Sequence, residues 1–361
     1  MKILTSVTLF ILMVPCCKRG VDEPPEKPDR KWIRVVPDRP AGPDSVPAKQ
    51  VLGEDSSIAA DTVSTPETVA QIPADRLPDY RRAYRLASKS VVLISARTEH
   101  ASRVGAGWAI GSGDRIVTSS KLVQGANQII VKTIDGHSFS ASLAGTDRFT
   151  QIALLNIKGE NLPAPATLSR ASPEVGQWIL GIGNPMGLSF SASRGIISAI
   201  GRSGPVWDHT SYGDFIQVDM PTNKGNSGGP LIDLDGRAIG LITVIEMDGK
   251  QLAFAIPCDM VKTVVEHLQV HGRLVRSWLG IMFSEQDLTV TRIRIGSPAS
   301  RSKLETGDRI ISIAGETVET PEQLRWKIAT APAEKSTQMT VERLGEVLLL
   351  DLTLEKVPEL P

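Results

Sequence analysis

Short apolar runs, each followed by turn residues, fill the chain from about residue 79 onward. They are rich in Val, Ile and Ala, and Gly, Asp, Asn or Ser interrupts them at close intervals. Many short strands at this spacing predict a barrel or a sandwich. The expected strands are 91–95, 105–110, 115–119, 129–132, 152–157, 178–182, 215–218, 231–233, 238–244 and 252–256.

Two local signals add a hairpin and a helix. Asp235-Gly236 lies between apolar runs, which is a strong hairpin signal. Met260, Val264 and Leu268 recur at helical spacing, and the stripe ends near Gly272. We therefore expect the β-rich domain to span residues 79–275 and to close with this helix.

A second, smaller α+β unit is expected over 276–357. Thr320 is the predicted N-cap of its helix, Pro321 lies in the first turn, and Gln323 closes a capping box. Leu324 and Ile328 continue the apolar face of the helix. Strand-like runs follow at 339–343 and 347–354.

The first 78 residues predict export followed by a tether. Residues 1–17 resemble an export signal, and Cys16 or Cys17 is placed where a bacterial lipoprotein carries lipid. The alternative is a plain signal peptide or an uncleaved anchor. Residues 18–78 hold 10 of the 24 prolines, many charges and few large apolar side chains, so they predict a disordered tether.

Composition excludes several classes of function. The 40 basic and 40 acidic side chains cancel, and aromatic residues make up only 4%, which argues against a nucleic-acid-binding protein. The five histidines show no metal-ligand spacing, so we expect no metal and no cofactor. Cys258 is the only cysteine of the expected folded part, so no internal disulfide is expected there.

Ser227 is the strongest candidate for chemistry. It stands in Gly225-Asn226-Ser227-Gly228-Gly229-Pro230, where glycines on both sides permit a tight loop. Such a loop aims the N–H groups of Gly225 and Ser227 at one point, as an oxyanion hole requires. A phosphate-binding loop is the competing interpretation, but the Gly-Lys-Ser/Thr ending is missing.

From about residue 80 to 356 the chain resembles the HtrA (DegP-like) family of trypsin-fold proteases with a C-terminal PDZ domain. The order and spacing of its motifs carry this resemblance: 105–108 (GAGW), 181–187 (GIGNPMG), 194–198 (RGIIS), 215–217 (FIQ), 223–231 (NKGNSGGPL) and 254–257 (FAIP). It implies two six-stranded β-barrels with the catalytic cleft between them, followed by a small PDZ domain.

The same resemblance identifies two departures from the catalytic triad. The family's histidine segment matches 117–123, which places Lys121 at the histidine position. The family's aspartate segment matches 150–153, which places Gln151 at the aspartate position. Asp147 matches the family's other, non-catalytic aspartate.

Loss of the general base alone removes about six orders of magnitude in turnover. Lys121 as a substitute base would need its pKa lowered by about three units, because only roughly one lysine in 2,500 is neutral at pH 7. We therefore expect impaired proteolysis. The alternative is an active endopeptidase that uses a Ser227–Lys121 pair, in the manner of Ser–Lys enzymes on other folds.

Peptide binding is expected in two places. Met220, Pro221 and Thr222 are predicted to line an apolar specificity pocket, and Leu241, Ile242 and Thr243 to pair by backbone with an extended peptide. In the PDZ-like unit, the resemblance gives Leu279, Gly280 and Ile281 as the carboxylate-binding loop. Leu324 and Ile328 lie on the helix that would form the other wall of the groove.

These observations predict an exported, periplasmic or envelope protein that binds unfolded chains or C-terminal peptides. The alternatives are the active endopeptidase and a tethered scaffold in which only the PDZ-like unit has ligands. The resemblance also implies a homotrimer, for which Tyr80 and Tyr84 are the candidate contacts. No nucleic-acid partner is expected.

Overall fold

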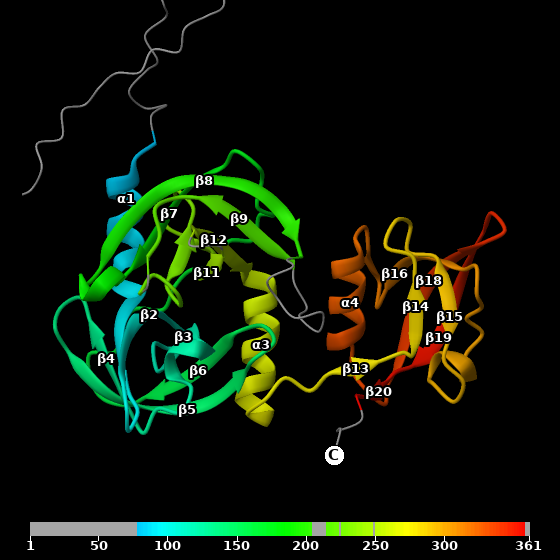
Figure 1. The fold of residues 1–361 in the computed structure, drawn as a ribbon, viewed down its shortest axis with the longest axis horizontal. Helices are drawn as coiled ribbons and strands as arrows, with labels where there is room; N and C mark the ends of the chain where they lie inside the picture. Colours follow the sequence, from blue (N-terminus) through cyan, green and yellow to red (C-terminus); the bar gives the residue numbers. More distant parts are fainter. Residues whose placement is uncertain (1–77, 204–213, 224, 248–249, 358–361) are drawn as a thin grey trace, which may run out of the picture. The chain divides into compact units, whose positions relative to one another are not determined.

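The computed structural model describes residues 78–203, 214–223, 225–247 and 250–357, which Figure 1 draws in colour. The predicted export signal and all of the tether except Pro78 lie outside these residues. None of the described helices is long and apolar enough to cross a bilayer. A short helix, α1 (Tyr80–Ala87), and a 3-10 turn, η2 (Ser88–Ser90), lead into the first strand.

The first barrel is closed, with strand order β1-β2-β3-β6-β5-β4 (Figure 1). Its strands are β1 (Val91–Arg97), β2 (Ser102–Ile110), β3 (Arg115–Ser119), β4 (Gln128–Thr133), β5 (Ser138–Asp147) and β6 (Ile152–Ile157). In β4 the buried Ile129, Val131 and Thr133 alternate with exposed residues, the pattern of a sheet with one face in the core. One helical turn, α2 (Ser120–Val123), follows β3 directly.

The second barrel is also closed, in the order β10-β11-β12-β9-β8-β7. Its strands are β7 (Trp178–Gly183), β8 (Ser191–Arg202), β9 (Phe215–Asp219), β10 (Pro230–Ile232), β11 (Ala238–Met247) and β12 (Lys250–Pro257). A 3-10 turn, η3 (Pro185–Gly187), joins β7 to β8. The mainly β, double-barrel fold class is therefore confirmed.

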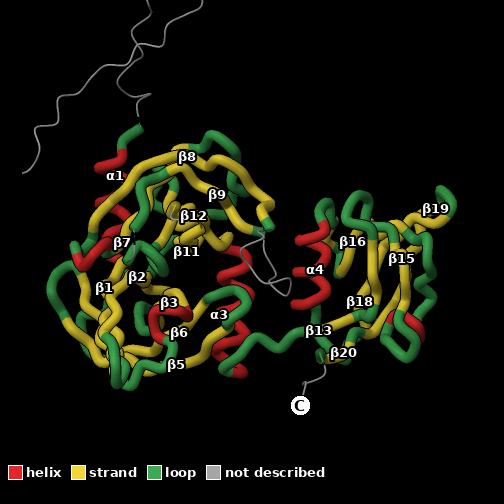
Figure 2. Tube along the Cα trace, viewed as in Figure 1, coloured by secondary structure: helices red, strands yellow, loops and turns green. Residues whose placement is uncertain are grey.

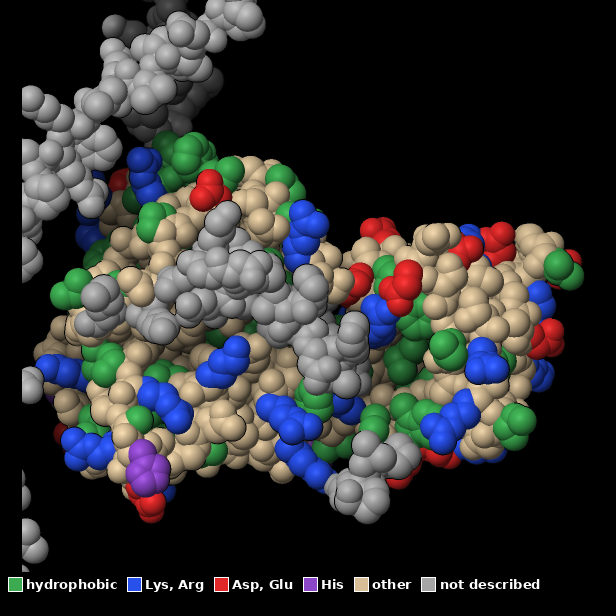
Figure 3. Space-filling view, viewed as in Figure 1, with side chains coloured by type: hydrophobic (Ala, Val, Ile, Leu, Met, Phe, Trp, Pro, Cys, Tyr) green, Lys and Arg blue, Asp and Glu red, His purple; other side chains and the backbone are tan. Residues whose placement is uncertain are grey.

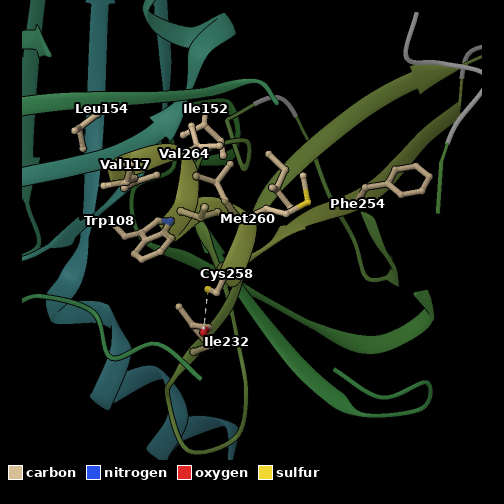
Figure 4. Packing of buried hydrophobic residues seen from close by; sticks show 14 of the residues in the cluster. Trp108, Val117, Ile152, Leu154, Ile232, Phe254, Cys258, Met260 and Val264 are labelled. Atoms are coloured by element: carbon tan, nitrogen blue, oxygen red, sulfur yellow. Dashed lines mark hydrogen bonds between the residues drawn. The ribbon is translucent and has the colours of Figure 1, made fainter. Parts of the chain in front are cut away.

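The helix α3 (Cys258–His271) packs on β5 and β6 of the first barrel and on β11 and β12 of the second. Its stripe of Met260, Val264 and Leu268 is buried, as the sequence predicted, beside Trp108 (Figure 4). The helix ends at Gly272, which adopts the left-handed conformation with φ of 67°.

Cys258, at the start of α3, is buried and its thiol donates to the carbonyl oxygen of Ala238 at 3.2 Å (Figure 4). Burial, and secondarily the neighbouring Asp259, raises the pKa of this thiol. The side chain is therefore a packing element of the barrel–helix junction, not a nucleophile.

The C-terminal unit has a hydrophobic core of its own, and Figure 2 colours its helix red and its strands yellow. Its elements are β13 (Ser277–Trp278), β14 (Ile281–Phe283), β15 (Val290–Ile293), η4 (Ala299–Arg301), β16 (Arg309–Ile313), β17 (Glu316–Thr317), α4 (Pro321–Thr330), β18 (Ser336–Arg343), β19 (Glu346–Thr353) and β20 (Glu355–Lys356). Strands β17, β16, β18 and β19 form one sheet in that order.

The N-terminus of α4 follows the predicted cap with one difference. Thr320 Oγ1 accepts from the N–H of Gln323 at 3.2 Å, and Pro321 is the first helical residue. The Gln323 side chain accepts from the N–H of Glu319 at 2.9 Å, one residue before the position that a capping box would use.

A buried ion pair ties the residue before β13 to the end of β5. Arg276 Nη1 and Nη2 each donate to one oxygen of Asp147 at 2.8 Å, and the two side chains are only 11% and 5% exposed. Asp147 Oδ2 also accepts from the N–H and the hydroxyl of Thr150, at 2.8 and 2.7 Å. This carboxylate therefore holds the short segment that leads to Gln151.

We expect Arg276→Met to lower the free energy of unfolding by about 3–5 kcal/mol, because it leaves a buried carboxylate without its cation. Arg148→Met is the matched control. Both guanidinium groups lie over the ring of Phe149, at 4.6 and 4.7 Å, but Arg148 is exposed. Urea unfolding of the two variants measures the difference, and equal losses would contradict the assigned role of the ion pair.

Candidate functional site

Ser227 lies in the turn between β9 and β10, and two glycines shape this turn. Gly228 has φ of +89°, and a Cβ on it would stand 2.3 Å from the carbonyl oxygen of Ala106 and 2.5 Å from Thr118 Oγ1. Gly225 has φ of +105°, and a Cβ there would stand 2.2 Å from the carbonyl oxygen of Asn184. Only glycine therefore fits at either position.

Backbone hydrogen bonds fix the same turn to its neighbours. The N–H of Gly228 donates to the Ile242 carbonyl and the N–H of Ile242 donates to the Gly229 carbonyl, both at 2.8 Å. The N–H of Asn184 donates to Gly225 at 3.0 Å. The amide and the carbonyl of Ile242 are both used in these bonds. They are therefore not available for the backbone pairing with an extended peptide that the sequence predicted for Ile242.

Asn184 is a bridging residue that sequence reasoning did not single out. It is fully buried, its Nδ2 donates to the carbonyls of Val92 and Gly105 at 3.3 and 2.9 Å, and its Oδ1 accepts from the N–H of Phe190 at 2.8 Å. It therefore ties the loop after β7 to the first barrel. The only available signal was an asparagine between Gly183 and a proline in one of the matched motifs.

Lys121 is the second residue of α2, and the residues just before it contact both the Gln151 segment and the Ser227 turn. The N–H of Ser120 donates to the Gln151 carbonyl at 2.8 Å. A Cβ on Gly228 would stand 2.9 Å from the N–H nitrogen of Ser119. The Ser227 turn and the Gln151 segment therefore both lie against the residues that immediately precede Lys121.

Lys121 is exposed, and its pKa is nevertheless lowered. Burial lowers the pKa of its ammonium group, and among the described residues no carboxylate contributes to the shift. Arg103 Nη1 donates to the carbonyls of Lys121, Leu122 and Gln124 at 3.1, 3.3 and 2.7 Å, which anchors α2. On the face that Figure 3 shows, Lys and Arg side chains gather over the first barrel.

Gln151 is buried and strained. Its backbone has φ of +60°, a left-handed conformation that costs a non-glycine residue free energy, and the residue is 7% exposed. Its Oε1 accepts from the hydroxyl of Thr243, itself buried, at 3.2 Å. The structure thus brings the segments of Lys121, Gln151 and Ser227 together, while their catalytic roles stay predictions.

The three residues predicted to line a specificity pocket lie at different depths in the structure. Met220 is only 6% exposed, and a Cβ on Gly181 would stand 2.5 Å from its Cε, so Met220 belongs to the core of the second barrel. Pro221 is exposed and Thr222 is partly exposed. Leu241 shares the burial of Ile242 and Thr243, so its side chain is also inaccessible.

In the C-terminal unit, most predicted groove residues are core residues. Leu279, Leu324 and Ile328 are buried in its apolar cluster. Gly280 has φ of +80°, with its carbonyl accepting from the N–H of Arg294 at 2.9 Å. Ile281 opens β14 and is partly exposed, so its side chain is one of the predicted groove residues that solvent reaches.

Arg325 crosses from α4 toward β14. Its guanidinium carbon lies 5.3 Å from the centre of the Phe283 ring, and it pairs with Glu285 and with Glu322.

Among the described residues of the whole chain, no group of three His, Cys, Asp or Glu side chains could hold a metal ion.

Comparisons with known proteins match both units. A family model described as trypsin-like peptidase domain matches residues 105–241, and one described as PDZ domain matches residues 277–354. The chain is 32% identical over 306 residues to the serine endoprotease DegS of Haemophilus influenzae, with 79% of this chain and 90% of the relative covered. It is 33% identical over 280 residues to a probable periplasmic serine endoprotease DegP-like of Pseudomonas putida, with 73% of this chain and 58% of the relative covered.

Solved structures agree with these relatives. The structure of the HtrA-type protease AlgW with tripeptide is 30% identical and matches with a TM-score of 0.65, covering 78% of this chain and 98% of that one. The serine endoprotease from Yersinia pestis is 28% identical and matches with a TM-score of 0.58, covering 77% and 98%. The chain spans little more than half the length of the DegP-like relatives.

We expect Gly228→Ala to disrupt the Ser227 turn, because the new methyl group would overlap the backbone of β2 and the Thr118 hydroxyl. Gly136→Ala is the matched control: its φ is +95°, but no atom lies within 4 Å of the position that a Cβ would take. The control should cost about 1 kcal/mol of unfolding free energy from backbone strain, and Gly228→Ala several times more. Denaturant unfolding compares them, and equal costs would contradict the steric constraint.

Proposed function

Since the chain belongs to the HtrA (DegP-like) family of trypsin-like serine proteases with a C-terminal PDZ domain, we propose that it is an exported, proteolytically impaired member that binds polypeptides. It captures unfolded chains, or the C-terminal peptides that a PDZ groove accepts. The DegP-like relatives carry the word periplasmic in their names, which supports an envelope location for this chain.

The observation that carries this proposal is the identity of two residues. Lys121 stands at the position of the general base, and Gln151 stands at the position of the carboxylate that orients the base. A serine hydroxyl needs a neighbouring proton acceptor near neutral pH, and a carboxylate orients that acceptor in the triad. Lys121 is a cation unless its pKa falls by several units, and Gln151 has no charge. Gln151 is moreover held by Thr243, which keeps its amide in the place where a carboxylate would lie.

The second candidate function is endopeptidase activity with Lys121 as general base. The observation in its favour is that burial lowers the pKa of Lys121. A Ser–Lys enzyme requires the lysine to be largely neutral at working pH. Lys121 is exposed to solvent, which limits how far burial alone can lower its pKa.

Attachment is argued from the N-terminal sequence, and assembly from the family resemblance. We propose lipid on Cys16 or Cys17 as the membrane anchor, and a homotrimer as the assembly. Tyr80 and Tyr84 make contacts within their own chain: the Tyr80 ring meets Trp178 edge-on at 6.3 Å, and the Tyr84 hydroxyl donates to Phe190 at 3.0 Å. Trp178 is 47% exposed, so it extends this aromatic surface toward a neighbouring copy.

A fluorophosphonate probe tests the proposal directly. Because a lysine stands at the position of the histidine base, we expect labelling at pH 7 no faster than that of Ser227→Ala, together with binding of unfolded casein and no cleavage. Labelling that depends on Ser227, accompanied by casein fragments on a gel, would establish the endopeptidase instead. Loss of the labelling in Lys121→Met would then identify the base.

The double change Lys121→His with Gln151→Asp should raise casein cleavage by about 10³-fold or more, because it supplies both a base and its orienting carboxylate. Asp tolerates the left-handed backbone of position 151 better than Gln does, and Thr243 can donate to the new carboxylate. The single changes are controls and should stay near the unaltered protein. An inactive double variant would show that the oxyanion site is not competent.

A further inference from the structure

One edge of the C-terminal sheet has no partner among the residues that the structure describes. The sheet runs β17-β16-β18-β19, so β19 pairs with β18 on one side only (Figure 1). The pairing covers residues 346–353 without a shift of register. Every second residue of an edge strand directs its N–H and C=O groups away from its neighbour. In the described part of the chain, no hydrogen bond outside this ladder involves the backbone of β19.

The strand β19 lacks the features that protect sheet edges in most proteins. The opposite edge of the same sheet, β17, is only two residues long, and its shortness protects it. By contrast, β19 has eight residues, contains no Lys, Pro or Gly, and has no β-bulge. Leu350 and Leu352 on its inner face are buried, so the strand cannot slip along β18 without exposing them. A long, regular edge of this kind is a template for a further strand.

The outer face of β19 has a row of two apolar residues and one acidic residue. Val347 and Leu349 are 67% and 63% exposed, and the exposed Asp351 follows two residues later. Residues two apart on a strand share one face, so the three side chains lie in one row along the edge. Asp351 has no ion-pair partner among the described residues, and its neighbour across β18 is the uncharged Gln338.

We propose that β19 binds an extended polypeptide segment by strand addition, and that this segment carries two apolar residues and one Lys or Arg at alternate positions. An added strand places its side chains about 5 Å from those directly opposite. Alternate residues of the ligand therefore lie beside Val347, Leu349 and Asp351, and the basic residue pairs with the carboxylate. A parallel ligand reads apolar-x-apolar-x-basic, and an antiparallel ligand reads the reverse.

The inference goes beyond the proposed function, because it adds a site with a different ligand. A PDZ groove accepts the terminal carboxylate of a peptide, whereas strand addition at β19 needs only a backbone and the right side chains. Internal segments of a polypeptide therefore suffice. A second copy of β19 is the other conceivable occupant, but this strand has two acidic residues and no basic residue to place beside Asp351.

Hydrogen–deuterium exchange of the full chain locates the ligand. The probes are Ac-Thr-Val-Thr-Ile-Thr-Arg-Thr-NH2 and the peptide of reversed sequence, Ac-Thr-Arg-Thr-Ile-Thr-Val-Thr-NH2. Amidation removes the terminal carboxylate. The tighter of the two should slow exchange of the fast amides in 346–353 about tenfold, because ligand carbonyls accept from them. Protection of β14 alone would assign the peptide to the PDZ groove, and either that result or no protection would overturn the inference.

Charge reversal tests the pairing with Asp351. By fluorescence anisotropy, the Arg-containing peptide should bind about five- to tenfold more tightly than the same peptide with Glu in place of Arg. Asp351→Lys should reverse this order. Glu160→Lys makes the same change of net charge at an exposed site after β6, and should keep the preference for Arg. Equal affinities of the two peptides for the unaltered protein would overturn the inference.

A second pair of variants tests the edge itself. Leu349→Lys places a lysine in the row and should weaken binding at least about tenfold, because edge lysines oppose strand addition. Leu344→Lys is the matched control, since Leu344 is fully exposed in the turn between β18 and β19 and lies outside the row. Equal losses in the two variants would contradict the site. Protection of 346–353 that rises with protein concentration in the absence of peptide would assign the edge to a second copy and overturn the inference. Ser227 takes no part in these measurements, so they are independent of the fluorophosphonate test.

Discussion

A single steric constraint joins the two barrels at the candidate site: no side chain fits at position 228. Ala106 and Thr118 belong to the first barrel, whereas the Ser227 turn precedes β10 of the second, so this contact sets the placement of Ser227 and of the barrels together. Asn184 adds a second, polar connection. Its Nδ2 donates to carbonyls on two strands of the first barrel, and its Oδ1 accepts from the N–H of Phe190 in its own loop. The buried stripe of α3 then covers the junction from behind.

Much of this fold could be predicted from local pattern. The expected strands at 115–119 and 152–157 agree with β3 and β6 at both ends, because each has an apolar centre, at 116–117 and 152–155, and polar turn residues beside it. Strands β5 and β8 were not predicted. Their sequences are rich in Ser, Ala and Gly, and each contains shifts of register that break the period of two. The strands that close each barrel pair with partners far away along the chain. A short stretch of sequence therefore does not predict these pairs.

The candidate site, like the fold, could be predicted only in part from the sequence. The family resemblance was enough to identify positions 121, 151 and 227, because each lies within a short motif that the resemblance matches. It did not predict that Thr243 donates to Gln151, since the two are 92 positions apart. Nor did it predict that Ile242 uses its backbone groups on the Ser227 turn, or that Met220 faces the core. Met220 and Ile242 are apolar, but the side on which each lies depends on barrel closure.

Cys258 gives the junction of barrel and helix a consequence for the proposed export of this chain. Thiol–disulfide exchange and oxidation both begin from an accessible thiolate. This sulfur is enclosed by packing, engaged with a carbonyl, and shifted toward its protonated form. In the part of the chain that the structure describes, the folded barrels therefore present no accessible thiol to the oxidants and disulfide-exchange enzymes of an oxidising compartment. Their cohesion there depends on packing and polar bonds alone.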